Sequence, residues 1–585
     1  MAINKIGDVR PSQLITTFGP GSIIDAKRDC VTILDINYWE KNGKEIKDSR
    51  FASYMGVDFF KEPPTTTNRN KNSEDLPVVS FPDYHICSKV SCSYIFKLSE
   101  HFDVEKYKKF GPKCPKCNFN AYPSRFIQIC PNGHMEDFDY NRWVHKGTSC
   151  DGELKLISTG TTSSLGDLMV TCTKCNATRS LAGLTSPENN CSCNGHHPFR
   201  PAISGERCRA QMKIVQRGAS NVYFPVIKSA ISIPPYTDRI YVLIDEHKRE
   251  LESFRAAKKL NSAMPDPEEL LYQMFFSTEF SKDDFIKALR NSENDTRDYL
   301  SIKKSEYLAI INHNNPVNMR SPHVFKAEES EIPSILKPYF SRVIRITRLR
   351  EIMCLKGFTR LDAPDPEAEE QVNIVKLNTS KKWLPGVEVN GEGIFIEFNK
   401  ESIDSWLSKN DVKQIDEKFK KYFKRYSEKR GWSIIYERGA LYALMHTFSH
   451  LLIKVMGNKS GYSTSAIKER IYSGDNMMGI LLYTGSSDKE GSLGGLVELG
   501  KFEKFIPIIQ TAFEEALLCT NDPECMLNDI DDNLNISACH SCCMISETAC
   551  ENGNRMLDRG LIVPINEDCD KSFFSDLVKE MCEIE

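Results

Sequence analysis

Three close cysteine pairs have the spacing of metal ligands: Cys114–Cys117, Cys172–Cys175 and Cys539–Cys542. Two cysteines three residues apart present both thiolates to one ion across a tight turn, and tetrahedral zinc needs four such donors. Eleven of the 21 cysteines lie between Cys87 and Cys208, and eight more lie between Cys519 and Cys582. This clustering predicts structural Zn2+ sites in two separate parts of the chain.

Disulfide bonds are the alternative interpretation of these cysteines. The chain begins with MAINKIGDVRP, which is charged but is not followed by the apolar stretch of a secretory signal. We therefore expect a cytoplasmic protein, whose thiols stay reduced and whose paired cysteines favour metal over crosslinks.

The C-terminal cluster is predicted to form one closed, structural four-thiolate site. The expected ligands are Cys525, Cys539, Cys542 and Cys550. Cys519 and Cys543 are less favoured, although neighbouring cysteines could substitute for one another. Cys569 and Cys582 are expected to be free thiols.

The first cluster has enough donors for two or three sites. A zinc-ribbon-like site is predicted from Cys87, Cys92, Cys114 and Cys117. A second is predicted from Cys172, Cys175, Cys193 and Cys208. A third ion, or alternative ligands for the other two, could use Cys130, His134, Cys150 and Cys191. Spacing alone does not give the partnering.

The sequence offers few candidates for catalysis, and we predict no catalytic residue. His446 and His450 have the spacing of a zinc-protease helix, but Thr447 occupies the position where that motif needs its glutamate base. Their apolar neighbours favour hydrogen-bonded core histidines instead. Asp558 and Arg559 follow the last cysteine pair and are expected to support the metal loop.

Two glycine-rich loops could cradle a phosphate or simply form turns. The first contains Gly19 and Gly21, and the second runs from Gly491 to Gly495. Neither has the Gly-Lys-Ser/Thr ending of a P-loop, so ATP hydrolysis by this chain is not expected.

One local basic strip stands out in a chain whose net charge is −4. It contains Arg200, Arg207, Arg209, Lys213 and Arg217, against Glu206 alone. Such a strip could follow a nucleic-acid backbone, with contacts that weaken as salt rises. The alternative is a solvated edge of the metal module. The metal context favours nucleic acid, so these five residues are our candidate DNA contacts.

The chain has 585 residues, which is too long for one hydrophobic core. We therefore predict a multidomain α+β protein. We expect an N-terminal loop and strand region (1–80), a Cys-rich zinc module (81–237), a helical insertion (238–336), a mixed connecting region (337–429) and a C-terminal zinc-binding domain (430–585). No apolar run approaches the ~20 residues that span a bilayer, so we expect no membrane passage.

Local patterns predict several elements around the C-terminal site. Residues 439–456 are almost wholly apolar and predict a buried helix ended by Gly457. Residues 392–399 and 478–484 predict strands. Residues 341–361 mix basic and apolar side chains and predict a basic helix followed by a turn at Gly357.

Several segments resemble the DrmB family of the DISARM anti-phage system. They include VRPSQLITTFGPGSIID (9–25), CPNGHMEDF (130–138), QRGASNVYFPVIKSAI (216–231), HTFSHLLIK (446–454) and ACHSCCMISETACENGNRMLDR (538–559). The C-terminal segments also resemble the zinc-bearing domain that follows some bacterial DNA-repair helicases. Where the family usually has a plain CxxC pair, this chain has Cys87 and Cys92, separated by four residues.

The resemblance implies a role in antiviral defence without catalysis. It implies a partner of the helicase-like ATPase DrmA that acts with it on incoming phage DNA, beside a DNA methyltransferase, and a C-terminal domain that binds zinc. Direct DNA contact is our own inference from the basic strip. Two alternatives remain open: a zinc-dependent hydrolase or nuclease that uses His446, His450 or the Asp558–Arg559 region, and a standalone accessory of a DNA-repair helicase.

Overall fold

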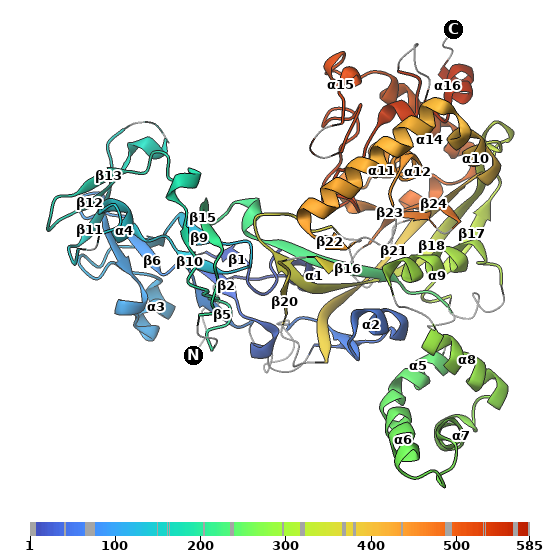
Figure 1. Cartoon of the computed structure of the whole chain (residues 1–585), viewed down its shortest axis with the longest axis horizontal. Helices are drawn as coiled ribbons and strands as arrows, with labels where there is room; N and C mark the ends of the chain where they lie inside the picture. Colours follow the sequence, from blue (N-terminus) through green and yellow to red (C-terminus); the bar gives the residue numbers. More distant parts are fainter. Residues whose placement is uncertain are drawn as a thin grey trace.

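The computed structural model of the chain describes residues 7–582 with short gaps. The gaps fall at 28, 40–42, 65–75, 149, 161, 163, 203–204, 235–238, 295–297, 316–321, 366–369, 372, 378–381, 434–436, 475, 486–493, 531, 533 and 566–570. The Cys-rich module lies at one end of the molecule, a long sheet in the middle, and a helical C-terminal layer at the other end (Figure 1). The predicted α+β class is confirmed.

The central sheet has the order β16-β18-β21-β24-β23, with β17, β20, β3 and β4 paired at its margins. Its five main strands are β16 (Phe224–Ile231), β18 (Phe340–Thr359), β21 (Trp383–Phe398), β23 (Ile467–Gly474) and β24 (Met477–Thr484). The predicted boundary between residues 429 and 430 therefore divides one continuous sheet. Likewise β16, inside the range predicted for the Cys-rich module, belongs to the central sheet.

The predicted helix at residues 341–361 is wrong, because this segment is most of the 20-residue strand β18. The strand pairs antiparallel with β16 and β17 on one side and with β21 on the other. Its β-branched residues suit a pleated strand with neighbours on both sides. Gly357 lies within the strand, where an added Cβ would meet the carbonyl oxygen of Val375 at 2.3 Å.

One face of the central sheet carries the C-terminal helices. They are α10 (Lys400–Ser408), α11 (Asn410–Arg430), α12 (Ala440–Ser460), α14 (Phe502–Leu517) and α16 (Ser575–Cys582). The predicted buried helix is α12, but it continues past Gly457 and ends at Gly461, which adopts φ of +80°. Its apolar residues share one extensive core with the sheet and the segment that carries the last cysteines.

The Cys-rich module consists of two small antiparallel sheets. The six-stranded sheet contains β6 (Tyr84–Cys87), β7 (Tyr94–Lys97), β8 (Ala121–Pro123), β11 (Leu154–Ser158), β12 (Leu168–Cys172) and β13 (Thr178–Ser180). The four-stranded sheet contains β9 (Phe126–Ile129), β10 (Met135–Asp137), β14 (Cys191–Ser192) and β15 (Gln211–Gln216). These strands are short. Three of the apolar clusters between them are small, and the fourth, which includes Phe126 and Trp143, has thirteen buried members.

Residues 238–336, predicted as a helical insertion, contain five α-helices and the strand β17 (Lys326–Ser330) in their described part. The helices are α5 (Arg239–Glu246), α6 (Lys248–Leu260), α7 (Pro267–Leu271), α8 (Lys282–Asn294) and α9 (Tyr299–Ile311). The first four project from the sheet around their own apolar cluster (Figure 1). By contrast α9 lies on the sheet, where buried Glu306 pairs with Arg470 of β23 at 2.6 Å.

The N-terminal region joins the Cys-rich module to the central sheet. It includes α1 (Pro11–Thr16), β1 (Ile23–Asp25), β2 (Cys30–Ile33), α2 (Ser49–Met55), β4 (Phe59–Lys61) and β5 (Val78–Ser80). No helix among the described residues is both long and apolar enough to cross a membrane.

Candidate metal centres

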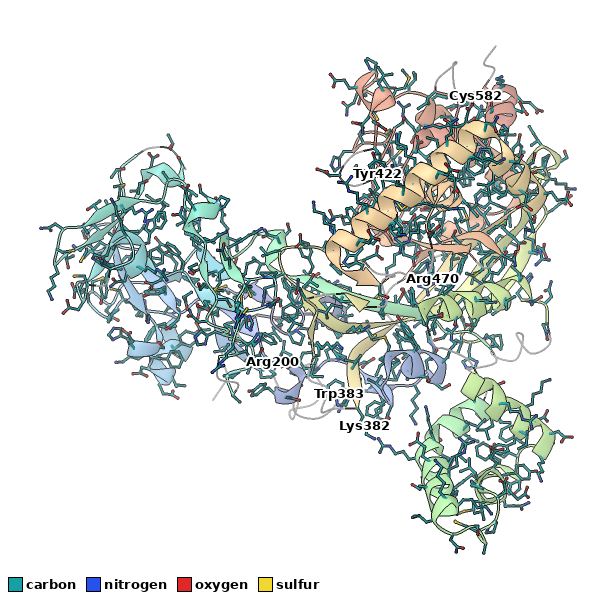
Figure 2. All side chains as sticks on the ribbon, viewed as in Figure 1. Arg200, Lys382, Trp383, Tyr422, Arg470 and Cys582 are labelled. Carbon is teal, nitrogen blue, oxygen red and sulfur yellow. The ribbon has the colours of Figure 1, made fainter. Side chains whose placement is uncertain are left out.

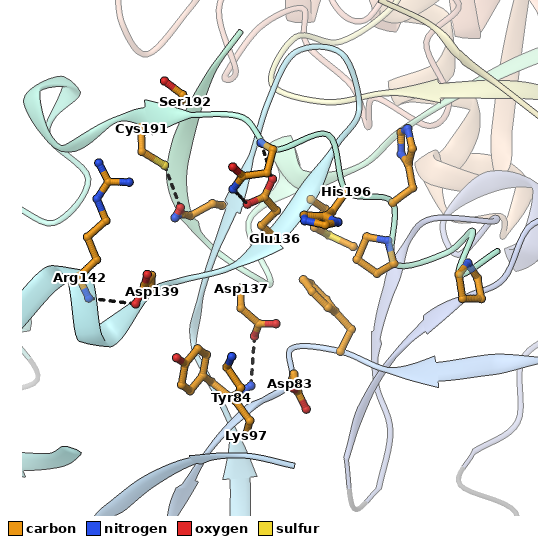
Figure 3. Close-up of a pocket in the computed structure, with 17 residues that line it drawn as sticks. Asp83, Tyr84, Lys97, Glu136, Asp137, Asp139, Arg142, Cys191, Ser192 and His196 are labelled. Carbon is orange, nitrogen blue, oxygen red and sulfur yellow. Dashed lines mark hydrogen bonds between the residues drawn. The ribbon is translucent and has the colours of Figure 1, made fainter. Parts of the chain in front are cut away.

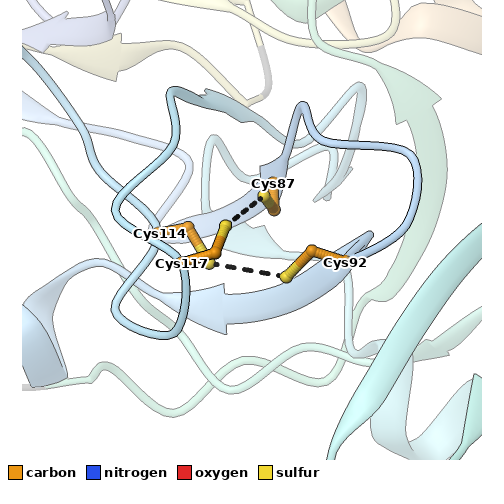
Figure 4. A group of neighbouring side chains, drawn as sticks. All are labelled: Cys87, Cys92, Cys114 and Cys117. Carbon is orange, nitrogen blue, oxygen red and sulfur yellow. Dashed lines mark hydrogen bonds between the residues drawn. The ribbon is translucent and has the colours of Figure 1, made fainter.

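The structure brings together the four cysteines of the first predicted site, Cys87, Cys92, Cys114 and Cys117 (Figure 4). Cys87 ends β6, and the other three lie in neighbouring turns. The Sγ atoms of Cys87 and Cys117 are 3.4 Å apart, and those of Cys92 and Cys114 are 3.8 Å apart. Four thiolates around tetrahedral zinc lie about 3.8 Å from one another, since each Zn–S bond is about 2.3 Å. The wider Cys87–Cys92 spacing therefore still closes a four-donor group.

The second predicted set is divided between two groups in the structure. Cys172 and Cys175 lie with His145 and Cys150, whereas Cys193 and Cys208 lie with Cys130 and His134. Each group has three sulfur donors and one imidazole nitrogen. Cys191 belongs to neither of these two groups, and its thiol donates to the side chain of Gln128 at 3.1 Å.

Strand pairing explains this regrouping. Leu154 of β11 pairs with Cys172 of β12, which brings the preceding Cys150 to the same end of the sheet. In the other sheet β9 pairs with β15, so Cys130 at the end of β9 meets the turn residues around β14 and β15. Which ligands belong to the same group is therefore set by the antiparallel pairing of distant strands, and cysteine spacing does not reveal that pairing.

Backbone amides favour the thiolate form that zinc requires. A hydrogen bond from the backbone N–H of Phe119 lowers the pKa of Cys117 to about 7. Burial raises the pKa of Cys172, but backbone N–H groups of Cys175 and Lys174 outweigh it and bring the pKa to about 6. Cys117 and Cys172 are therefore the members of their groups that ionise most readily, whereas burial raises the pKa of Cys87 to about 12.

In the C-terminal domain the structure brings together Cys519, Cys525, Cys539 and Cys542. Cys519 takes the place that the sequence interpretation gave to Cys550. The Sγ–Sγ distances are 3.4 Å for Cys519–Cys539 and 3.8 Å for Cys525–Cys542. A hydrogen bond from Cys543 lowers the pKa of Cys542 to about 5. Cys519 reaches the group because it follows directly after the long helix α14.

The remaining C-terminal cysteines have different positions. Cys550 lies beside His446, with 3.1 Å between its Sγ and the histidine Nε2. Cys582 is half-buried in α16, and Cys569 lies outside the described residues. As predicted, His446 and His450 are core residues with hydrogen bonds, and both are fully buried.

The Asp558–Arg559 region supports the fold around the C-terminal group. Asp558 caps a short 3-10 helix (Arg559–Leu561) by accepting from the backbone N–H of Gly560. Arg559 is buried, donates to the carbonyl oxygen of Ala516 and pairs with Asp522. The Arg559 side chain therefore holds the segment that carries Cys519 in place, whereas Asp558 stabilises the short helix after the last cysteines.

The five residues of the basic strip fall into two sets: two form ion pairs within the protein, and three are exposed. Arg200 pairs with Asp35 at 2.6 Å and donates to the carbonyl oxygen of Lys376, where the Cys-rich module meets the central sheet (Figure 2). Arg217 pairs with Asp25 at 2.9 Å. In contrast Arg207, Arg209 and Lys213 are exposed and form no ion pair with any described residue. Only these last three are available to an outside partner.

The Cys-rich module also contains a cavity of about 560 Å³ (Figure 3). Its walls include the carboxylates of Asp83, Glu136, Asp137 and Asp139. Burial raises the pKa of Asp137 to about 6, although the backbone N–H of Tyr84 donates to it at 3.1 Å. These four carboxylates outnumber the cations Lys97 and Arg142 in the lining, which disfavours a nucleic-acid phosphate.

The first glycine loop is a buried turn rather than an exposed phosphate cradle. Gly21 has φ of +84°, and an added Cβ would lie 2.7 Å from the ring of Phe358. Its carbonyl oxygen accepts from buried Arg360 at 2.9 Å. Most of the second loop, residues 491–493, lies outside the described part of the chain.

Comparison with known proteins assigns these regions. Residues 10–224 match a domain of unknown function, DUF8724, and residues 448–543 match the MrfA Zn-binding domain. The second range contains all four cysteines of the C-terminal group, which confirms the prediction of structural zinc. The chain is 41% identical over 578 residues to the DISARM protein DrmB of Bacillus paralicheniformis, and the match covers 95% of this chain and 100% of the relative. With that identity along nearly its whole length, this zinc-domain protein belongs to the DrmB family of DISARM proteins.

Proposed function

We propose that this chain is a non-catalytic, DNA-associated subunit of a DISARM defence complex. In this role it works with the helicase-like ATPase DrmA to recognise or restrict incoming phage DNA. The observation that carries the proposal is the 41% identity to a DISARM DrmB across 95% of the chain. A cytoplasmic location is part of the same proposal, because that is where incoming DNA is met.

The donor sets of the metal groups support a structural rather than a hydrolytic role. Each of the four groups described above offers four protein donors from cysteine and histidine. A catalytic zinc site keeps one position open for water, whereas a closed four-donor site does not. His446 and His450, the candidates for a hydrolase, are fully buried and out of reach of a polymeric substrate.

The exposed basic residues support direct DNA contact. Arg207 and Arg209 flank Cys208, a member of one metal group, and Lys213 lies in β15, where it pairs with Ile129 of β9, so the backbone of all three is held in place. Each phosphate contact releases counterions, and the slope of log affinity against log salt changes by about 0.9 per contact. Three lost contacts should therefore reduce that slope by about 2 to 3.

DNA binding by the complex with DrmA tests this contact. A variant with Arg207, Arg209 and Lys213 all changed to alanine should bind a labelled duplex more weakly, with a shallower salt dependence. The control changes the exposed residues Lys259, Lys287 and Arg290 of the helical insertion to alanine, which removes the same charge. Equal loss in both variants would show a general charge effect and would refute the proposed contact.

Copurification and turnover assays test the rest of the proposal. The chain and DrmA should form a stable complex, and the chain alone should neither hydrolyse ATP nor cut DNA. Separation of the two proteins on gel filtration would contradict the partnership. DNA cleavage by the chain alone would instead establish the hydrolase alternative.

A further inference from the structure

Four buried side chains converge in the C-terminal domain outside the four-cysteine group. His446 and His450 come from α12, Glu469 from β23, and Cys550 from the turns that follow Cys542. Their donor atoms lie within 4.8 Å of one another. We propose that these four residues bind a divalent metal ion of the Zn2+ class, as a second structural site in this domain.

The donor spacing fits a single tetrahedral ion. His446 Nε2 is 3.0 Å from Glu469 Oε1 and 3.1 Å from Cys550 Sγ. His450 Nε2 is 3.3 Å from the same carboxylate oxygen. With Zn–N and Zn–O bonds of about 2.0 Å and a Zn–S bond of about 2.3 Å, neighbouring donors lie about 3.3 to 3.6 Å apart. The two histidines are four residues apart, so they occupy the same face of α12.

The hydrogen bonds around His450 favour an ion over a purely hydrogen-bonded cluster. Its Nδ1–H donates to the carbonyl oxygen of Cys543 at 2.8 Å. Its Nε2 lies 3.3 Å from Glu469 Oε1, so both ring nitrogens of this fully buried side chain face oxygen atoms that accept hydrogen bonds. An ion between Nε2 and the carboxylate would be bound by both. A carbonyl that fixes the other ring nitrogen in this way is the usual partner of a metal-bound histidine.

The two anionic donors are also held in place. Cys550 Sγ accepts hydrogen bonds from the backbone N–H groups of Asn552 at 3.3 Å and Asn554 at 3.1 Å. Glu469 accepts from the backbone N–H of Glu551 at 3.0 Å and from the hydroxyl of Ser449. One thiolate and one carboxylate balance the charge of a divalent ion. All four donors come from the protein, so the site is closed and structural.

The proposed ion would tie the C-terminal turns to the core. It joins α12 and β23, which are neighbours in the sequence, to the segment that carries Cys550, which is far from both. Because His450 donates to the carbonyl oxygen of Cys543, the residue after Cys542, the site also supports the four-cysteine group. This explains why Cys550 lies outside that group despite its place in the same cysteine cluster.

Metal content per full-length chain tests the proposal. The Cys550→Ser variant should hold one ion fewer than the unaltered protein, as measured by mass spectrometry of metals after gel filtration. The control is Cys354→Ser, since Cys354 is fully buried in β18 and belongs to none of the donor groups described here. Equal metal content in all three proteins would overturn the proposal.

A second measurement does not depend on the folding of a variant. Diffraction from crystals of the unaltered chain, recorded on both sides of the zinc absorption edge, should show an anomalous peak between His446, His450, Glu469 and Cys550. A peak at the Cys519 group with none at this position would refute the site directly.

Discussion

The metal groups of the Cys-rich module and of the C-terminal domain have similar donors but very different surroundings. Around the first group of the module, the buried apolar cluster has five members, and Cys87 and Cys114 are two of them. Around Cys130 and Cys193 it has three members, and again two are ligands. The C-terminal group instead adjoins a core that extends over the sheet, α12 and α14. Where few apolar side chains are buried, metal binding must supply the free energy of folding.

Removal of metal should have the largest effect on stability, and the two regions should respond to it differently. With a strong chelator the segments around the Cys87 and Cys130 groups are expected to unfold, because apparent zinc-binding energies of about 10 kcal/mol are folding energy where few apolar side chains are buried. The C-terminal helices should retain their structure. Hydrogen exchange followed by mass spectrometry would measure this, and added zinc should restore protection. Equal loss of protection in α12 and β9 would contradict the comparison.

Single ligand replacements should sharpen the same contrast. Cys114→Ser removes a donor from a group with almost no other core, so β6 and β8 should lose protection from exchange. Cys542→Ser should also lose an ion, but α12 and α14 should stay folded because their apolar core is intact. Thermal unfolding followed by circular dichroism would compare the loss of structure in the two variants. The comparison would be contradicted if Cys542→Ser lost more helical structure than Cys114→Ser lost structure in the Cys-rich module.

Arg360 should have an intermediate effect, because it joins the Cys-rich module to the central sheet on which the C-terminal helices pack. Its buried guanidinium donates to the carbonyl oxygens of Gly21 at 2.9 Å, Gly133 at 2.9 Å and Val222 at 2.5 Å. Arg360→Met leaves three buried acceptors without donors, each costing about 1 kcal/mol or more, so about 3 kcal/mol of stability should be lost. Chemical denaturation would measure this.

The matched control for Arg360 is Arg217→Met. Arg217 also donates to backbone carbonyls of the module, but its side chain is 20% exposed, so water can replace it. A loss for Arg217→Met as large as that for Arg360→Met would show that burial is not the cause.

The smallest expected effect is an acid-dependent contribution from Asp29. Burial raises the pKa of this carboxyl, but hydrogen bonds and charge from His85, together with the Tyr107 hydroxyl, outweigh it and lower the pKa. A carboxyl with a depressed folded-state pKa stabilises the fold above its unfolded value of about 3.9 and loses that contribution as pH falls through the folded value. Asp29→Asn should therefore flatten the fall in stability below about pH 4. Unchanged acid unfolding curves would contradict this role.

Local sequence patterns correctly predicted the elements that are determined by residues close together in the sequence. The apolar run of α12, the strand β24 and the turn pair Cys114–Cys117 were all visible from neighbouring residues. The strand β18 was misinterpreted because its basic residues resemble a helix surface, whereas its conformation depends on partners from distant segments. For the same reason, the single ligand set predicted for Cys172 and Cys193 is divided in the structure, because antiparallel strand pairing determines which cysteines lie together.

The sequence by itself identified two cysteine clusters with the composition of metal sites, and which chemical groups would supply the donors. Residue type and short spacing suffice for that, since a CxxC turn is local. Only the tertiary structure decided that Cys519 joins the C-terminal group and that Cys550 turns toward His446 and Glu469. The physical reason is that each four-donor group closes across several elements, and the packing of α12 against β23 and the final turns sets which donors meet.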